Sequence, residues 1–324
     1  MHRYDLAPEL TPTYVEEVWQ RLPRYLRPTL LLPAPRLSEA LGCQLLLASE
    51  TFQYTGSFKF RAAYHLLASV PQRQIITASS GNFGQAVAYA ARLLGKEATI
   101  VMPSTAAHVK IEAVRAYGGR VELTDVRRVS RQERVAQLAR KQPEAFIAPA
   151  YDDYRVVVGN STLGQEILRQ AEVDVLLVPV GGGGLISGQI IARDLLGRPT
   201  RIIGAEPLPG NDAARSLHSG QLLTNEMEPE TVADGARTLS LGRLNWEIIR
   251  QGVEEIIEVP DEVTLDALRR LFLLANLKVE PTGALALGAL LLQPERFRGQ
   301  RVCCIVSGGN VDPALYAQAL SDWP

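Results

Sequence analysis

The chain has 324 residues, of which 46% are hydrophobic, and its 34 Lys and Arg nearly balance its 35 Asp and Glu to give a formal net charge of -1. This length and composition predict a globular protein with a sizeable core and about two domains. The balanced charge excludes the electrostatic footprint of a nucleic-acid-binding protein, and the longest apolar stretch, residues 283–292, is far shorter than the ~20 residues of a membrane-spanning helix.

Short apolar runs rich in β-branched residues predict the buried strands of a parallel sheet. They lie at Gln44–Ala48, Gln74–Ala78, Glu97–Val101, Val173–Val180, Arg201–Ala205 and Val302–Val306. Segments with helical spacing alternate with them, at Gly84–Leu94, His108–Tyr117, Val129–Arg140, Leu185–Leu196 and Val263–Ala275. This alternation predicts an α/β architecture in which helices cover both faces of a sheet.

Polar, turn-rich stretches near residues 70–73 and 142–153 bracket a compact α/β block. We therefore predict that residues 73–148 form a small domain inserted into a larger one, which consists of residues 1–72 and 149–324.

The three cysteines show neither a disulfide framework nor a zinc-binding pattern, since Cys43 stands alone and Cys303 and Cys304 are adjacent in an apolar run. Residues 1–10 are polar and lack the apolar core of a secretion signal. We expect a reducing, cytoplasmic compartment.

Four loops at predicted strand ends carry unusual residues, and ligands of open α/β sheets bind beyond the carboxyl ends of the strands. The first loop, Thr55–Arg61, contains Lys59 between two phenylalanines. An apolar setting lowers the pKa of a lysine and makes its amine nucleophilic. A lysine whose stem packs while its ammonium reaches water is the commoner arrangement, but Lys59 is one of five lysines in the whole chain.

The second loop, Ser79–Gln85, leads from a predicted strand into a helix and is rich in serine and glycine. The free N–H groups and the dipole of a helix N-terminus suit an anion such as a carboxylate. A helix cap by Ser80 or Asn82 is the alternative, although a single serine would suffice for it.

The third loop follows the predicted strand Val173–Val180 and consists of Gly181, Gly182, Gly183 and Gly184. Such a run is costly in backbone entropy, and its consecutive N–H groups can form a nest for a phosphate. Neither the P-loop nor the dinucleotide-binding fingerprint fits the spacing. We therefore expect the phosphate of some other ligand.

The fourth loop, Ser307–Asp312, places a serine hydroxyl at the same edge, where an ordinary turn is the alternative. Together the four loops predict a ligand that has a phosphate, a carboxylate and a carbonyl able to react with an amine. Pyridoxal phosphate joined to an amino acid has all three.

In order and context, the four loops resemble those of the pyridoxal-phosphate enzymes of the tryptophan synthase β fold, in the threonine dehydratase and serine racemase branch. Further matching stretches are Gly204–Pro207, Thr231–Gly235 and Val279–Ala284. The resemblance implies two open, twisted, mostly parallel sheets flanked by helices, with the small domain closing over the site. The chain departs from the pattern near the expected substrate side chain, at Phe83, Ala148–Ala150 and Gly159–Thr162.

By this resemblance, Lys59 would bind the cofactor covalently and later move the substrate α-proton. Phe58 would lie against the pyridine ring, Asn82 would bond its phenolic oxygen, and the four glycines would hold the phosphate. Ser307 would face the ring nitrogen and leave it unprotonated, which gives a weaker electron sink suited to prompt β-elimination.

The resemblance places the substrate carboxylate at the loop of Ser79, Ser80, Gly81, Asn82 and Phe83. Ser80 occupies the position of the second proton-transfer residue of the racemases, on the ring face opposite the lysine. Serine is also common there in relatives that do not racemise, so Ser80 is compatible with both activities.

The segment Glu206–Asp212 resembles the divalent-cation loop of the same branch. Glu206 and Asp212 would supply carboxylate oxygens and Gly210 its carbonyl to Mg²⁺, Ca²⁺ or Mn²⁺. The alternative is that Asp212 caps the helix starting near Ala213.

The resemblance thus implies an ammonia-lyase, or dehydratase, that converts L-threonine, L-serine or both to a 2-oxo acid and ammonia. The open alternatives are a serine or aspartate-type racemase with side dehydratase activity, a 3-hydroxyaspartate dehydratase, a threonine synthase-like lyase and a non-catalytic amino-acid-binding protein on the same scaffold. We expect a small amino acid as the ligand, a homodimer, and neither nucleic acid nor membrane as a partner.

Overall fold

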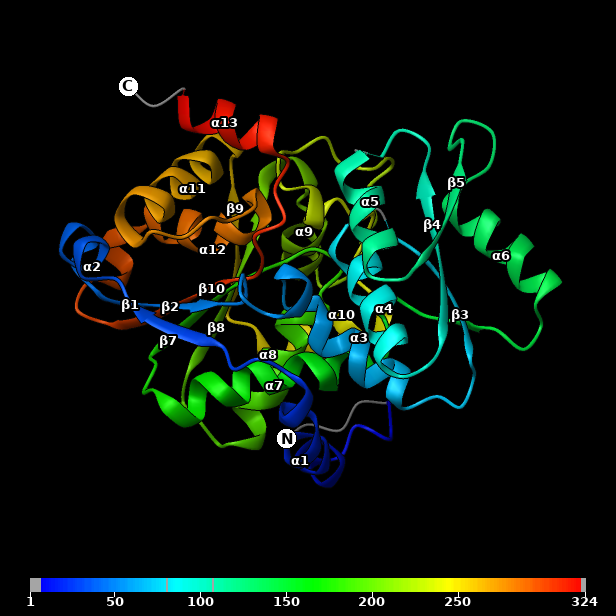
Figure 1. The fold of residues 1–324 in the computed structure, drawn as a ribbon. Coiled ribbons are helices and arrows are strands. Elements are labelled where there is room, and N and C mark those ends of the chain that lie inside the picture. The colour runs from blue at the N-terminus through cyan, green and yellow to red at the C-terminus, as the bar shows by residue number, and fades with distance from the viewer. Residues whose placement is uncertain (1–6, 80, 107, 322–324) are drawn as a thin grey trace.

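The larger of two β-sheets forms the core of one half of the molecule in the computed structural model, which describes residues 7–79, 81–106 and 108–321 (Figure 1). Its six strands lie in the order β1 (Leu30–Pro33), β2 (Gln44–Ser49), β10 (Arg301–Val306), β7 (Val175–Pro179), β8 (Arg201–Pro207) and β9 (Glu255–Val259). All neighbours are parallel except β1, which pairs antiparallel with β2 at the edge. The expectation of an open, mostly parallel sheet is confirmed.

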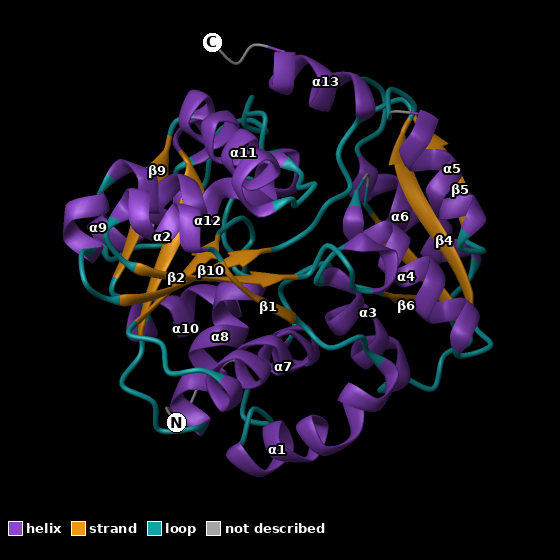
Figure 2. Cartoon of the chain, turned by 60° about the vertical axis from the view of Figure 1, so that its left-hand side comes forward, coloured by secondary structure: helices purple, strands orange, loops and turns teal. Residues whose placement is uncertain are grey.

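Helices cover both faces of this sheet (Figure 2). One face packs against α7 (Tyr154–Gln170), α8 (Gly184–Leu195) and α10 (Arg243–Gly252), and the other against α2 (Pro35–Leu41), α11 (Asp261–Ala275) and α12 (Pro281–Leu292). Strand β7 sends Leu176 into the first core and Leu177 into the second. Because both faces are buried, the strand is apolar throughout rather than alternating.

The second sheet has four parallel strands in the order β5 (Arg120–Thr124), β4 (Glu97–Pro103), β3 (Gln74–Ala78) and β6 (Phe146–Ile147). Its helices are α4 (Asn82–Leu93), α5 (His108–Ala116) and α6 (Arg131–Lys141). All of these elements fall within the block 73–148 that the sequence marks off. That this block moves as a small domain stays a prediction.

The helix α3 (Lys59–Ala68) lies where the two sheets meet, between α4 and α7 (Figure 1). Arg61 anchors it, because its fully buried guanidinium bonds Glu50, which follows β2, and Glu166 on α7. This buried ion cluster holds the first turn of α3 against two other elements.

The remaining helices lie at the periphery of the large sheet. They are α1 (Pro12–Arg21), α9 (Asp212–Ser219) and α13 (Pro313–Ser321), with short 3₁₀ turns at Leu22–Tyr25, Tyr54–Gly56, Leu208–Gly210, Asp234–Ala236 and Pro294–Phe297. Within the described ranges, no helix combines the length and the apolar character needed to cross a membrane.

Candidate active site

The first and fourth loops are joined at the carboxyl edge of the large sheet, because β2 and β10 are neighbours there. Ser57 and Gly308 form an antiparallel bridge, and the Phe58 N–H donates to the Ser307 carbonyl at 3.0 Å. Ser57 and Ser307 are both buried. The Ser57 hydroxyl has no hydrogen-bond partner among the described residues, so a buried polar group here is free to bond a ligand.

Lys59 lies at this joint, partly buried, with its Nζ 4.9 Å from the centre of the Phe58 ring. Burial lowers the pKa of Lys59 to about 8, and the nearby carboxyl of Glu280 opposes that shift. Because a larger share of such an amine is neutral near pH 7 than of a free lysine, Lys59 has the nucleophilic character expected from its sequence setting.

The second loop reaches the same place from the small sheet through Asn82. The Asn310 side-chain amide donates to Asn82 Oδ1 at 2.8 Å, and Asn82 Nδ2 donates to Glu280 Oε1 at 2.7 Å. The orientation of the Asn82 amide is therefore fixed, and one of its two N–H hydrogens remains for a ligand.

The cap of α4 comes from Ser79, whose hydroxyl accepts the N–H groups of Gly81 at 3.3 Å and Gly84 at 2.9 Å. Asn82 is not the cap, since its side chain is engaged elsewhere. Ser80, the expected second proton-transfer residue, lies outside the described residues. Phe83, expected near the substrate, is buried in the first turn of α4.

Glu280 is the site residue that the sequence analysis missed. It is buried, and burial followed by the charge of Asp234 raises its pKa to about 8, while Asn82, Lys110 and Lys59 act in the opposite direction. A side chain at Gly308 would place its Cβ 2.5 Å from Glu280 Oε1. The sequence did offer a signal, because Glu280 lies in the matching stretch Val279–Ala284, directly before the proline that opens the almost wholly apolar α12.

The third loop lies next to the fourth, because β7 is the other neighbour of β10. Gly183 has the left-handed φ of +89°, and a Cβ on Gly182 would lie 2.4 Å from the Tyr151 ring. Packing and backbone conformation thus require glycine at both positions. Gly184 begins the twelve-residue α8, so the glycine turn also presents a helix N-terminus, which favours an anion such as phosphate.

The expected cation loop lies farther along the same edge, beginning with Glu206 at the end of β8. Both oxygens of the buried Glu206 carboxylate accept backbone N–H groups, from Ala213 at 3.0 Å and Ala214 at 2.8 Å. Glu206 rather than Asp212 therefore caps α9, and the alternative cap by Asp212 is wrong. Asp212 Oδ2 is buried without a hydrogen-bond partner in the described part of the chain, and Gly210 is buried in the preceding 3₁₀ turn.

Burial raises the pKa of Asp212 to about 7. It also raises that of Glu206, with a further contribution from Asp212. No group of three or more His, Cys, Asp or Glu side chains suited to a metal ion occurs among the described residues. A cation here would depend on these two carboxylates and a backbone carbonyl.

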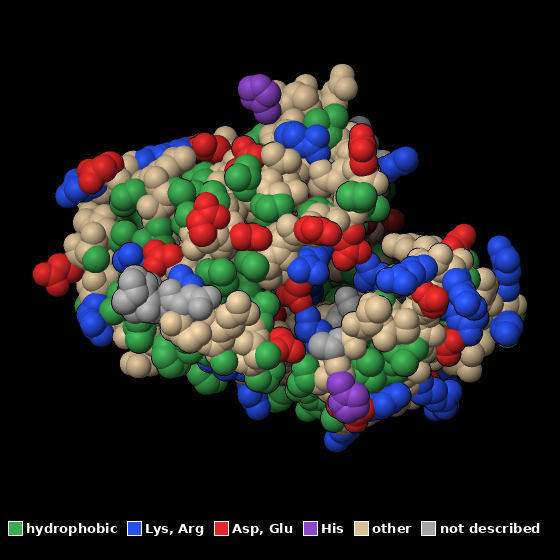
Figure 3. All heavy atoms as spheres, turned by 90° about the horizontal axis from the view of Figure 1, so that it is seen from above, with side chains coloured by type: hydrophobic (Ala, Val, Ile, Leu, Met, Phe, Trp, Pro, Cys, Tyr) green, Lys and Arg blue, Asp and Glu red, His purple; other side chains and the backbone are tan. Residues whose placement is uncertain are grey.

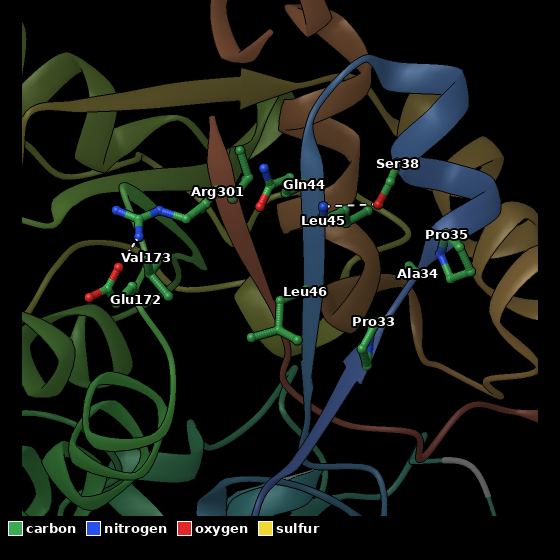
Figure 4. Close-up of a pocket in the computed structure, with 11 residues that line it drawn as sticks. Pro33, Ala34, Pro35, Ser38, Gln44, Leu45, Leu46, Glu172, Val173 and Arg301 are labelled. Carbon is green, nitrogen blue, oxygen red and sulfur yellow. Dashed lines mark hydrogen bonds and ion pairs between the residues drawn. The ribbon is translucent and has the colours of Figure 1, made fainter. Parts of the chain in front are cut away.

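Charged side chains surround a hollow between the two halves of the molecule when it is viewed from above (Figure 3). A separate open pocket of about 480 Å³ lies at the opposite edge of the large sheet, where Gln44 and Arg301 begin β2 and β10 (Figure 4). Because ligands of open α/β sheets bind at the carboxyl edge, the joint around Lys59 is the candidate active site.

Comparisons with known proteins identify relatives over almost the whole chain. Residues 22–308 match a family model described as "Pyridoxal-phosphate dependent enzyme". The chain is 37% identical over 319 residues to the L-threo-3-hydroxyaspartate ammonia-lyase of Saccharomyces cerevisiae, covering 96% of this chain and 97% of the yeast protein. It is 34% identical over 319 residues to the serine racemase of Schizosaccharomyces pombe, covering 96% and 98%. The solved structure of a threonine deaminase from T.th. is similar with a TM-score of 0.87 and 40% identity, covering 92% of this chain and 97% of that one.

Proposed function

This chain belongs to the family of pyridoxal-phosphate dependent enzymes, and from that premise we propose that it is an ammonia-lyase acting on a 3-hydroxy amino acid. L-Threonine and L-serine are the substrates we propose first. The observation that carries the proposal is the partly buried Lys59 amine, whose pKa is lowered to about 8, at the edge where the glycine turn and the Asn82 amide also lie.

The residues of the site fit pyridoxal phosphate. Lys59 would bind its aldehyde carbon, and the turn from Gly181 to Gly184 would hold its phosphate at the N-terminus of α8. Asn82 has one N–H left to donate to an oxygen on the ring, and Ser307 is buried beside Phe58 at the joint. When bound, the cofactor supplies an electron-withdrawing ring that makes the substrate α-proton acidic.

The chain's own groups account for the remaining steps. The neutral Lys59 amine would remove the α-proton, and the β-hydroxyl would take up that proton and leave as water when the α–β double bond forms. The enamine released from the enzyme tautomerises and is hydrolysed to a 2-oxo acid and ammonia. Docking of the second loop over the site would exclude bulk water and keep the substrate in reacting geometry.

A second candidate substrate is L-threo-3-hydroxyaspartate. The observation favouring it is that two relatives bearing that activity in their names, from Saccharomyces cerevisiae and a Pseudomonas species, are 37% and 38% identical to this chain. Serine racemisation is the alternative reaction, since the Schizosaccharomyces pombe relative is named a serine racemase. A homodimer, a cytoplasmic location and a divalent cation held by Glu206, Gly210 and Asp212 stay predictions.

One experiment separates these possibilities. Cofactor-loaded protein is supplied in parallel with L-serine, L-threonine and L-threo-3-hydroxyaspartate in the presence of Mg²⁺, and both the 2-oxo acid and the configuration of the remaining amino acid are measured. Oxo acid without the D-enantiomer supports the lyase and ranks its substrates. Substantial D-serine with little oxo acid would overturn it in favour of a racemase.

The variant that tests the role of Lys59 is Lys59→Ala. Because the neutral amine is both the cofactor's attachment point and the base, we expect this variant to lose the cofactor's visible absorbance and at least ~10³-fold of its turnover together. Full turnover by a correctly folded Lys59→Ala protein would contradict the proposal.

A further inference from the structure

Two ion pairs bridge the two halves of the molecule. Lys110 on α5 donates from Nζ to Asp234 Oδ2, and Arg131 at the start of α6 lies with Nη2 3.1 Å from Glu228 Oε2. Both cations belong to the four-stranded half, and both carboxylates belong to the segment between α9 and α10 in the other half. The two cations are also similarly buried, with side chains 20% and 24% exposed.

The Lys110 pair lies beside the candidate active site, because the N–H of Gly235, directly after Asp234, donates to Thr282 Oγ1 at 2.9 Å, two residues from Glu280. The charges of Asp234 and Lys110 both act on the pKa of the buried Glu280 carboxyl. Glu280 in turn accepts the Asn82 amide at 2.7 Å. The Arg131 pair, by contrast, ends at Glu228, which is 53% exposed.

We propose that Lys110 is a positioning residue, which couples docking of the four-stranded half to the charge of Glu280 and thereby to the hold of Asn82 on the bound cofactor. Lys110 does not touch the reacting atoms. It acts through Asp234 when their ion pair joins α5 to the larger half, and the charge of Glu280 then governs its hydrogen bond with the Asn82 amide. This inference rests on the proposed function, because it assumes a cofactor bound beside Asn82.

The charges in this chain of contacts oppose one another. Asp234 favours the protonated form of Glu280, whereas Lys110 and Lys59 favour the ionised form. When one nearby charge is removed, the pKa of a buried and partly screened group changes by about one unit. Lys110→Met should therefore raise the pKa of Glu280 and Asp234→Asn should lower it. When both charges are removed, the two opposite shifts of the Glu280 pKa should largely cancel.

The test uses the cofactor-loaded enzyme and four variants: Lys110→Met, Lys110→Arg, Asp234→Asn and the double variant Lys110→Met/Asp234→Asn. Two quantities are followed from about pH 6 to about pH 10: the absorbance of the bound cofactor without substrate, and kcat/KM with the substrate that the wild type prefers. Arg131→Met is the matched control, because it breaks a bridge of similar burial that ends at an exposed carboxylate.

We expect Lys110→Met to move the pH profile upward by about one unit and Asp234→Asn to move it downward. The double variant should return to within about 0.3 unit of the wild type, and Lys110→Arg should retain the wild-type profile. Arg131→Met should leave the absorbance profile where it is. A purely structural bridge would instead make the double variant at least as defective as either single variant.

The inference is overturned if neither single variant moves the absorbance profile, or if the double variant shows the summed losses of the two. These results differ from failure of the proposed function. If the wild type binds pyridoxal phosphate but converts none of the amino acids, the absorbance measurement still tests Lys110.

Discussion

The buried guanidinium of Arg61 offers the sharpest test of how α3, and with it Lys59, is held in place. Arg61 is fully buried and donates to Glu50 at 2.7 and 2.9 Å and to Glu166 at 3.0 and 3.1 Å. It also donates to Thr29 at 2.7 Å and to Thr162 at 3.2 Å. The substitution Arg61→Met keeps the length and apolar stem of the side chain but removes all of these bonds.

The expected loss of stability follows from the two carboxylates left behind. Removing one partner of a buried ion pair costs about 3–5 kcal/mol, because the other charge remains buried without compensation. Burial alone would raise the pKa of Glu166, but Arg61 and Thr29 more than offset it and hold this pKa below its ordinary value. This contribution to stability is fully present above the unfolded pKa, near pH 4–5, and is lost as the pH falls through the lower folded value. The difference between wild type and variant should therefore be largest near neutral pH and shrink below about pH 4.

Urea unfolding at about pH 7.5 and about pH 3 measures both parts of this prediction. Arg201→Met is the control, since the Arg201–Glu254 pair is 37% and 35% exposed and such pairs contribute about 1 kcal/mol or less. A loss below about 1 kcal/mol for Arg61→Met near neutral pH, or a loss that grows on acidification, would refute the reasoning.

Three further predictions concern the site. The rate at which apoprotein takes up pyridoxal phosphate should rise with pH to about 8 and then level off, because the neutral Lys59 amine is the attacking form. A rate that does not change between about pH 6 and 9 would count against this role of Lys59. Gly182→Ala should weaken cofactor binding at least tenfold in an absorbance titration, since its Cβ would meet the Tyr151 ring at 2.4 Å, and the added change Tyr151→Ala should recover part of that loss. Chelation by EDTA should lower the melting temperature and Mg²⁺ should restore it, because a cation would compensate the charge of the buried Glu206 and Asp212 carboxylates. An unchanged melting temperature and activity would exclude a bound cation.

Local pattern was sufficient to predict the central strands but not the edges of the sheets. The run Val173–Val180 indicated β7 because it is buried on both faces, and the ends differ by one or two residues. Strand β1 has four residues and β6 has two, too few for a pattern to emerge. The helix α7 was missed because its first turns contain Val156, Val157 and Val158 followed by Gly159, a composition more typical of a strand.

The residues of the candidate site also fall into two groups, those that their own segment predicts and those that only the fold brings together. Lys59 and the glycine turn were predictable because their neighbours in sequence are also their neighbours in space. Glu280 was not, since the Asn82 side chain that it bonds lies 198 residues away. Lys110 and Asp234 were overlooked for the same reason, because their ion pair joins positions 124 apart and neither stands out in its own segment.

The position of β10 has a consequence for how the polypeptide acquires its structure. This strand comes last of the ten along the described residues, yet it pairs with β2 on one side and β7 on the other. Until it inserts, β2 and β7 present unpaired edges, which are templates for association with other chains. Parallel pairing over such separations is slow, so during synthesis the nascent chain would carry exposed edges until residues 301–306 have left the ribosome. We expect a chain truncated before Arg301 to aggregate rather than to form a smaller folded protein.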